Sequence, residues 1–238
     1  MREGAPSWHL YPGPETLAGA LAAAIVRLAR ESIDRHGSFH MVLAGGNTPR
    51  TVYARIRQTG HQWERWHLYY SDERCVPRES PDRNSRMAEE TWLAHVPVPV
   101  RQHHVIPAEL GPGPGARAYA ALLPSHRFDL VLLGLGEDGH CASLFPEGEW
   151  PLLEAPFHPA VLPVRWAPRP PGHRVSMGSM RLRHTRRMMF LVSGSEKTRA
   201  VHQWRAGERI PAAIVGAGAE IWLDEAAWTG ADASGALF

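Results

Sequence analysis

The apolar run FDLVLL at residues 128–133, followed by the glycine-rich loop GLGEDGH at residues 134–140, decides the fold class. The run is apolar along its whole length apart from Asp129, so it predicts a strand that is buried on both faces. Strands of that kind occur in parallel sheets that helices cover on both sides. The stretch therefore indicates an α/β fold.

Outward from this strand, the same succession of strand, loop and helix recurs along the chain. Further strands or extended segments are predicted at residues 39–43, 66–70, 104–106, 160–164, 173–180, 188–192 and 220–223. Helices are predicted at residues 14–36, 49–57, 82–95, 117–123 and 196–205, and loops at the Gly/Pro-rich residues 111–115 and the Pro-rich residues 146–171. The alternation predicts one domain, residues 1–238, with a mainly parallel sheet flanked by helices.

In a parallel sheet the loops that follow the strands share one edge, and ligands bind there. Four loops are expected at that edge. They cover residues 45–49, 72–74, 136–146 and 194–197. We therefore expect an active site at the carboxyl ends of the strands.

The first of these loops joins a strand to a helix through Gly45, Gly46, Asn47, Thr48 and Pro49. Thr48 suits the N-cap position, and proline suits the first helical position. The two glycines let the backbone approach a ligand, and the free N–H groups of a helix start favour an anion. A plain tight turn is the alternative. The loop lacks the lysine of a P-loop, which argues against nucleoside triphosphate binding.

The second loop carries Asp72, Glu73 and Arg74. A guanidinium can hold a phosphate or a carboxylate through two parallel hydrogen bonds, so Arg74 is a candidate anion ligand. A structural ion pair beside the sheet explains the same three residues equally well. The spacing alone leaves both interpretations open.

The third loop contains Asp138, Gly139 and His140. Histidine ordinarily titrates near neutral pH, so His140 is a candidate general base. The glycines also match a dinucleotide-binding pattern, but Pro146 would end the long helix that such a pattern must open. Cys141 is a poor candidate for a nucleophile, because adjacent residues rarely present both side chains to one point.

Lys197 is the single lysine among 26 basic residues, and it follows Gly194 at the expected start of a helix. A compact ammonium at a helix start suits a phosphate, although a lone lysine can also be drift. Arg174, at the head of an extended segment, is a second candidate anion ligand. The arginines at positions 181, 183, 186 and 187 are interpreted as a solvated face.

Composition excludes several classes of protein. The net charge of +2 is too small for a dedicated nucleic-acid binder, and no apolar run is long enough to span a membrane. Two cysteines, Cys75 and Cys141, imply no disulfide framework, and the first residues do not resemble a signal peptide. We expect a cytoplasmic protein.

Taken together, these stretches resemble the 6-phosphogluconolactonase family. The strongest match is the stretch LGLGEDGHCASLFP at residues 133–146, and residues 43–49, 71–77, 84–88, 174–176 and 194–197 agree in order and spacing. The family usually has Ser at the positions of Asn47 and Arg83, and Thr at those of Cys141 and Ser176. The related glucosamine-6-phosphate deaminases continue after Asp-Gly-His into a Phe-Asn-Glu-Pro type sequence and typically carry an aromatic residue at the position of Arg74. Both differences favour the lactonase.

The resemblance implies a modified Rossmann-like fold and hydrolysis of 6-phospho-D-glucono-1,5-lactone, without a metal or a cofactor. His140 would be the general base, and Asp72 and Asp138 would position Arg74 or His140. Lys197 and Arg174 would bind the phosphate, with Arg74 shared between the phosphate and the ring. Arg74, or the backbone N–H groups around Gly45 and Gly46, would also be a candidate donor to the carbonyl oxygen. The remaining expected contacts to the substrate come from Gly45, Gly46, Asn47, Thr48, Asp138 and Gly139. The expected partner is a sugar-phosphate lactone, and the expected state is a monomer or weak dimer. A binding module that kept the fold and lost catalysis is the alternative.

Overall fold

The computed structural model describes residues 4–59, 61–148 and 157–230. Its centre is a seven-stranded sheet in the order β1-β10-β9-β6-β2-β3-β5, in which every neighbouring pair is parallel. The strands are β1 (Ser7–Tyr11), β2 (Phe39–Leu43), β3 (Trp66–Tyr70), β5 (His103–His104), β6 (Phe128–Gly134), β9 (Thr185–Val192) and β10 (Glu220–Asp224). The predicted α/β class with a mainly parallel sheet is confirmed.

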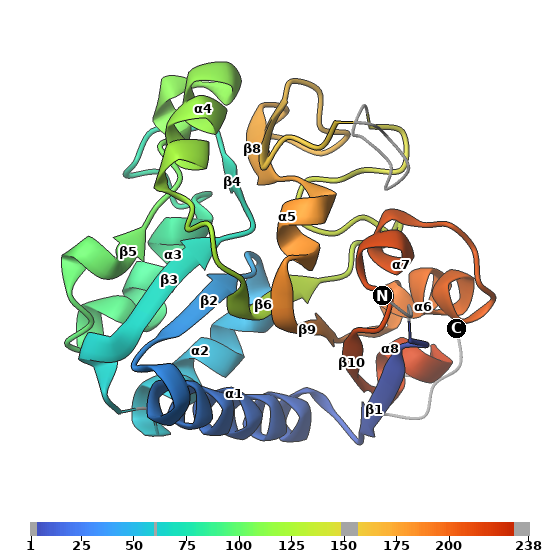
Figure 1. Cartoon of the computed structure of the whole chain (residues 1–238). Helices are drawn as coiled ribbons and strands as arrows, with labels where there is room; N and C mark the ends of the chain where they lie inside the picture. Colours follow the sequence, from blue (N-terminus) through green and yellow to red (C-terminus); the bar gives the residue numbers. More distant parts are fainter. Residues whose placement is uncertain (1–3, 60, 149–156, 231–238) are drawn as a thin grey trace.

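Helices lie on both sides of this sheet. They are α1 (Pro14–His36), α2 (Asn47–Thr59), α3 (Asn84–Thr91), α4 (Pro112–Leu122), α5 (Ser179–Arg183), α6 (Thr198–Arg205), α7 (Pro211–Val215) and α8 (Glu225–Thr229). In Figure 1, α1 and α2 lie below the sheet, and α4, α5 and α7 lie above it. Among the described residues, no helix combines the length and the hydropathy needed to cross a membrane.

The first helix shows how the local pattern sets its bounds. Its apolar side chains, among them Leu17, Leu21 and Ile25, recur every fourth residue and are buried. Gly37 ends the helix with φ = 86°, a left-handed conformation that glycine adopts without strain, and its N–H bonds to the carbonyl of Ile33. The predicted bounds of this helix are therefore confirmed.

The strand β6 occupies the middle of the sheet, and its residues from Phe128 to Leu133 are all buried. Asp129 is the polar exception, and its partners explain why it can be buried. Its Oδ2 accepts a hydrogen bond from the backbone N–H of His40, and its Oδ1 lies 3.0 Å from His36 Nε2 and 3.3 Å from Arg186 Nε. Burial on both faces, as predicted, is confirmed.

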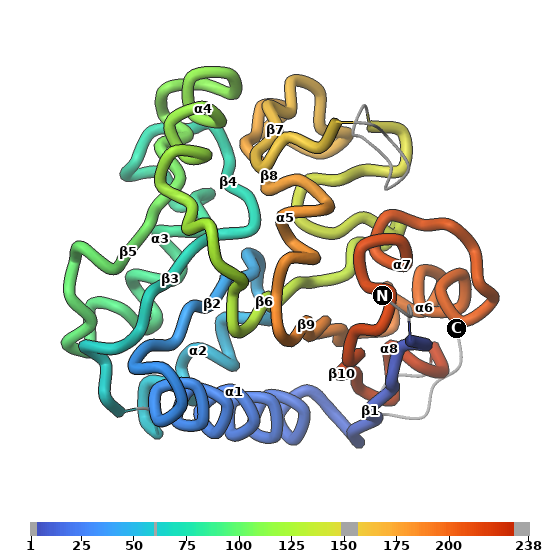
Figure 2. The backbone as a smooth tube through the Cα atoms, viewed as in Figure 1, coloured from blue at the N-terminus to red at the C-terminus, as the bar shows by residue number. Residues whose placement is uncertain are grey.

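A second sheet corrects the prediction that residues 72–74 form a loop. It contains β4 (Asp72–Arg74), β8 (Arg174–Met177) and β7 (Val161–Val164), paired antiparallel in the order β4-β8-β7. Figure 2 shows these strands toward the top of the view, on the same side of the main sheet as α4. The extended segment predicted at residues 173–180 is only partly right, because α5 begins at Ser179.

Several other predicted bounds differ from the structure. The helix α4 starts at Pro112, inside the predicted loop 111–115, because proline is tolerated in a first turn. The helix α3 is shorter than predicted, since Trp92 leaves helical geometry and a 3₁₀ turn follows. The helix α2 starts at Asn47, so Thr48 lies inside it and is not its cap. The elements β1, α7 and α8 were not predicted.

Candidate active site

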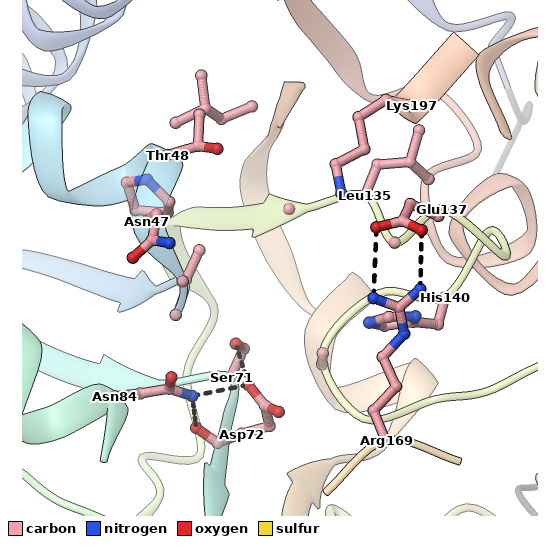
Figure 3. A pocket seen from close by; sticks show the side chains of 18 of the residues that line it. Asn47, Thr48, Ser71, Asp72, Asn84, Leu135, Glu137, His140, Arg169 and Lys197 are labelled. Atoms are coloured by element: carbon pink, nitrogen blue, oxygen red, sulfur yellow. Dashed lines mark hydrogen bonds and ion pairs between the residues drawn. The ribbon is translucent and has the colours of Figure 1, made fainter. Parts of the chain in front are cut away.

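A cavity of about 370 Å³ lies where β2, β3, β6 and β9 end. All four loops expected at this edge contribute to its wall, and Figure 3 shows side chains from them facing one another. Of the predicted site residues, the cavity is lined by Gly45, Gly46, Asn47, Thr48, Asp72, Arg74, His140, Arg174 and Lys197. Asp138 and Gly139 are absent from its lining and lie beside it in the same loop as His140.

The glycine-rich loop after β2 has no room for a side chain at Gly45. A Cβ atom there would lie 2.0 Å from Oδ1 of Asn84, which is buried at the start of α3. Gly46 has φ = 98°, a conformation that other residues rarely adopt. The loop therefore brings the first turn of α2, whose N–H groups have no partner within the helix, to the wall of the cavity.

Asp72 connects three separate segments at the base of the cavity. Its Oδ2 accepts a hydrogen bond from Ser143 Oγ at 2.5 Å, and its Oδ1 accepts one from Asn84 Nδ2 at 3.2 Å. Nη1 of the buried Arg174 lies 3.9 Å from Oδ2. Among the described residues, the carboxylate of Asp72 makes no contact with His140 or with the side chain of Arg74. The latter donates from Nη1 to the carbonyl of Asp82.

Glu73, between the two candidates of the second loop, has a structural role. Its carboxylate is fully buried, accepts the backbone N–H groups of Arg74, Asn84 and Ser85, and pairs with Arg83 at 3.3 Å. Burial raises the pKa of Glu73, and the hydrogen bond from Ser85 and the charge of Arg83 oppose the rise. The structural interpretation of this triplet therefore holds for Glu73, whereas Asp72 and Arg74 reach the cavity.

Arg83, where the lactonase family usually has Ser, is one of the largest fully buried side chains. It donates to the carbonyls of Val76 and Ile106 and also pairs with Glu109. A buried guanidinium is tolerated only when its charge and its N–H groups have partners. These contacts explain how the chain accommodates this departure behind the cavity.

His140 is held from one side by Asp138. Its Nδ1 lies 2.5 Å from Asp138 Oδ1, and that same oxygen accepts the backbone N–H of His140 at 3.1 Å. Burial raises the pKa of Asp138, but the hydrogen bonds and charge of His140 outweigh this and lower it to about 2. A carboxylate only accepts hydrogen bonds, so Nδ1 is the donor, and Nε2 carries the free lone pair of the neutral ring.

Two glycines allow this arrangement. Any Cβ at Gly136 would lie 2.0 Å from His140 Nδ1, and Gly139 adopts φ = 86° at a place where a Cβ would lie 2.8 Å from Cβ of Ile210. Cys141 is buried and is absent from the cavity lining, and burial raises the pKa of its thiol far above the ordinary value. Cys141 thus lacks the exposure and the thiolate character that a nucleophile needs.

Besides Arg74, three cationic side chains line the cavity: Lys197, and two arginines from one stretch of chain, Arg169 and Arg174. Lys197 lies 3.7 Å from its neighbour Glu196. Arg174 is nearly buried and donates to the carbonyls of Arg169 and Pro171. Arg169, which the sequence analysis did not single out, forms a two-point ion pair with Glu137.

Other lining residues were also not predicted as site residues: Ser71, Asn84, Leu135, Glu137, Ala142, Phe145, Arg169 and Ser193. Glu137 lies within the glycine-rich stretch of residues 134–140, and Arg169 lies in a run of prolines. Prolines restrict the backbone next to Arg169, and this restriction is the sequence signal from which Arg169 could have been predicted as a site residue. Within the described ranges, no group of three His, Cys, Asp or Glu side chains is arranged to hold a metal ion.

Comparisons with known proteins agree on one family. The family model described as "Glucosamine-6-phosphate isomerases/6-phosphogluconolactonase" matches residues 12–224. A "6-phosphogluconolactonase" from Synechocystis sp. is 33% identical, and the match covers 81% of each chain. The "GDH/6PGL endoplasmic bifunctional protein" of Oryctolagus cuniculus is 34% identical over 77% of this chain, which spans only 24% of that longer relative.

A solved structure shows the same fold. The crystal structure of 6-phosphogluconolactonase from Thermotoga maritima superimposes with a TM-score of 0.81 at 25% sequence identity. The superposition covers 92% of this chain and 99% of the other. The comparisons of sequence and of structure therefore agree, and the function of the cavity can be considered within this one family.

Proposed function

The chain belongs to the glucosamine-6-phosphate isomerase/6-phosphogluconolactonase family, and on this premise we propose that it hydrolyses 6-phospho-D-glucono-1,5-lactone to 6-phospho-D-gluconate. One observation carries the proposal. His140 is fixed by Asp138 at the wall of a cavity that Lys197 and three arginines also line. A positioned base and a cationic surface are the two features that a phosphorylated lactone requires.

His140 acts as the general base. Its Nε2 takes a proton from a water molecule as the water oxygen bonds to the ring carbonyl carbon. When the tetrahedral intermediate collapses, the bond to the ring oxygen breaks, and His140 returns the proton to that oxygen. A lactone is an activated ester, so this route requires neither a metal ion nor a covalent intermediate.

Negative charge develops on the carbonyl oxygen and needs donors that are already in place. The cavity wall offers two sources, the backbone N–H groups around Gly45 and Gly46, and Arg74. Asp72 supports this wall indirectly by holding Asn84, which packs against Gly45. Its part in the reaction is therefore to position other groups.

The phosphate lies far from the reacting carbon and orients the ring. Lys197 is the proposed principal ligand, with Arg74 shared between the phosphate and the ring. Arg174 contributes its charge, since its Nε and Nη2 already bond to backbone carbonyls. Asn47 and Thr48, in the first turn of α2, complete the proposed substrate contacts. Gly139 acts indirectly, because its left-handed conformation shapes the loop that carries His140. We further propose a monomer or weak dimer that acts in the cytoplasm.

The decisive experiment measures hydrolysis of freshly generated 6-phosphogluconolactone at neutral pH, with the spontaneous rate subtracted. The product is read through an excess of 6-phosphogluconate dehydrogenase. His140→Ala should lower kcat by about 10² to 10⁴, the usual contribution of a general base. His202→Ala, a change at an exposed position on α6, is the matched control and should not lower kcat.

Other outcomes would change the assignment. Wild-type kcat in His140→Ala would remove the histidine from the mechanism. Turnover of glucosamine 6-phosphate without lactone hydrolysis would identify a deaminase. Binding of 6-phosphogluconate without turnover of either compound would indicate a binding module.

A further inference from the structure

Two loops of opposite charge meet at one side of the cavity. Glu137 follows β6, and Arg169 precedes β8; Nη1 and Nη2 of Arg169 lie 3.3 and 3.0 Å from the two carboxylate oxygens of Glu137. Figure 3 shows the two parallel contacts, with His140 and Lys197 nearby in the view. The side chain of Arg169 is 51% exposed and that of Glu137 is 44% exposed, so the pair is accessible to a ligand.

Arg169 is held in place through its backbone. The buried Arg174 donates from Nη2 to the carbonyl of Arg169 at 3.1 Å and from Nε to that of Pro171 at 3.3 Å. These bonds occupy much of the guanidinium of Arg174 and fix the segment that carries Arg169. The guanidinium that is free to exchange partners is therefore that of Arg169.

Glu137 carries its charge next to cations from two directions. The hydrogen bond from Arg169 lowers the pKa of Glu137, and the charge of Lys197 lowers it further. The same pair raises the pKa of Arg169. Glu137, Arg169 and Lys197 all line the same cavity, so an anion that enters beside the carboxylate of Glu137 would meet both cations.

We propose that Arg169 is a phosphate-binding residue of this site, and that Glu137 is the counter-ion that a substrate phosphate displaces from it. The inference deepens the proposed function and rests on it for the identity of the phosphorylated ligand. A phosphate accepts two parallel hydrogen bonds from the N–H groups of a guanidinium, in the same way as a carboxylate does. Because exposed ion pairs contribute little stability, the exchange costs little.

Displacement of Glu137 also gives a basis for specificity. A phosphate dianion brings more charge than the single carboxylate, and it meets Lys197 as well as Arg169. A lactone without a phosphate leaves the pair of Arg169 and Glu137 intact and gains nothing from either cation. Arg169 therefore contributes to the preference for the phosphorylated substrate, and Arg174 is its positioning residue.

The test compares Arg169→Ala, Arg169→Lys and Glu137→Gln, with Arg165→Ala as the control at an exposed position in the same segment outside the cavity. Calorimetry measures the Kd of inorganic phosphate and of 6-phosphogluconate without turnover. We expect Arg169→Ala to weaken 6-phosphogluconate binding by about 10- to 100-fold, as for the loss of a hydrogen bond to a charged group. The Kd of Arg169→Lys should lie between those of the wild type and Arg169→Ala, because lysine keeps the charge and loses the two-point geometry.

Glu137→Gln removes the competing charge, so it should bind both anions more tightly than the wild type. With the lactones as substrates, the loss of kcat/KM in Arg169→Ala should be confined to 6-phosphogluconolactone and spare gluconolactone. Equal losses on both lactones, or binding in Arg169→Ala equal to that in Arg165→Ala, would overturn the inference. So would unchanged or weaker anion binding in Glu137→Gln, a variant that still tests the idea if Arg169→Ala does not fold. If the wild type hydrolyses neither lactone, the proposed function fails, and the binding measurements still decide the role of Arg169.

Discussion

The Nδ1 atom of His140 lies 2.5 Å from the Oδ1 atom of Asp138, two residues earlier in the same loop. Two side chains so close in sequence can meet because Gly139, between them, has φ = 86°, and because Gly136 leaves space for the imidazole. The contact fixes the tautomer in which Nε2 can accept a proton. The glycines of this loop thus position the proposed base, whereas a dinucleotide-binding loop would use them to approach a pyrophosphate.

The first prediction concerns this contact. Asp138→Asn replaces an obligate acceptor with an amide that can also donate, so the tautomer of His140 is no longer fixed. We expect kcat on 6-phosphogluconolactone to fall by at least about tenfold, but by less than the 10² to 10⁴ expected for loss of the base itself, with KM little changed. Asp34→Asn, at an exposed position on α1, is the control. An unchanged kcat in Asp138→Asn would show that the contact has no part in orienting the base.

The second prediction concerns the lysine. Lys197→Ala removes a cation from the cavity wall, so kcat/KM should fall by about 10- to 100-fold for the phosphorylated lactone, the loss of a hydrogen bond to a charged group. Gluconolactone should be affected much less. Lys197→Arg keeps the charge, so its kcat/KM for the phosphorylated lactone should fall less than that of Lys197→Ala. If Lys197→Ala keeps the full wild-type preference for the phosphorylated lactone, the phosphate is held elsewhere.

The third prediction concerns the contact between Gly45 and Asn84. Gly45→Ala would place a Cβ 2.0 Å from Asn84 Oδ1, and moving this amide breaks its bond to Asp72. We expect the free energy of unfolding to fall by about 1–3 kcal/mol, the usual cost of overpacking. Urea unfolding measures it.

The controls for this prediction separate a local clash from a general effect of alanine. Gly134→Ala is the matched change, because a Cβ at Gly134 meets nothing within 4 Å. The double variant Gly45→Ala/Asn84→Ala relieves the overlap, so it should be more stable than the sum of the two single changes predicts. Strict additivity would contradict the proposed clash.

Local sequence pattern predicted most of the main sheet, although not β1, because the predicted strands and the first helix each carry a signal of their own. The run 128–133 is apolar throughout, and α1 repeats apolar residues at helical spacing and ends at Gly37. In the second sheet, β7 and β8 correspond to the predicted segments 160–164 and 173–180, but β4 has no such signal. This strand is three charged residues, and it exists because Asp72–Arg74 pairs with residues 174–176 at a distance of about a hundred positions in the chain.

The same distinction applies to the site. The loops that follow strands could be placed at one edge from the topology of parallel sheets alone, and the structure does bring them to one cavity. Contacts between distant segments could not be predicted, because no local pattern encodes them. Asp72 bonds to Ser143, and Glu137 bonds to Arg169, and both pairs depend on how β8 and its preceding loop fold over the sheet.

The fourth prediction concerns a cluster of imidazoles that plays no part in the site. His40 and His67 stack at 4.4 Å on neighbouring strands, His104 continues the stack on β5, and His126 meets His40 edge-on. Burial and, to a smaller extent, the charges of neighbouring histidines together lower the pKa of His40 to about 3 and that of His104 to about 4. Burial lowers the pKa of His67 as well, assisted by the charges of His126 and Arg101.

These pKa directions fix the sign of a stability change. A histidine in the unfolded chain has a pKa of about 6.5. Below that pH the unfolded chain therefore binds protons at these positions, whereas the folded cluster stays unprotonated. Stability is therefore fully present above pH about 6.5 and is lost as the pH falls toward the folded values. Urea unfolding between pH 7 and pH 4.5 should show this loss. His104→Gln should reduce the slope, while His202→Gln, on the exposed side of α6, should retain the wild-type slope. Identical slopes in all three proteins would mean that carboxylates such as Asp129, which bonds to the backbone of His40, cause the acid sensitivity instead.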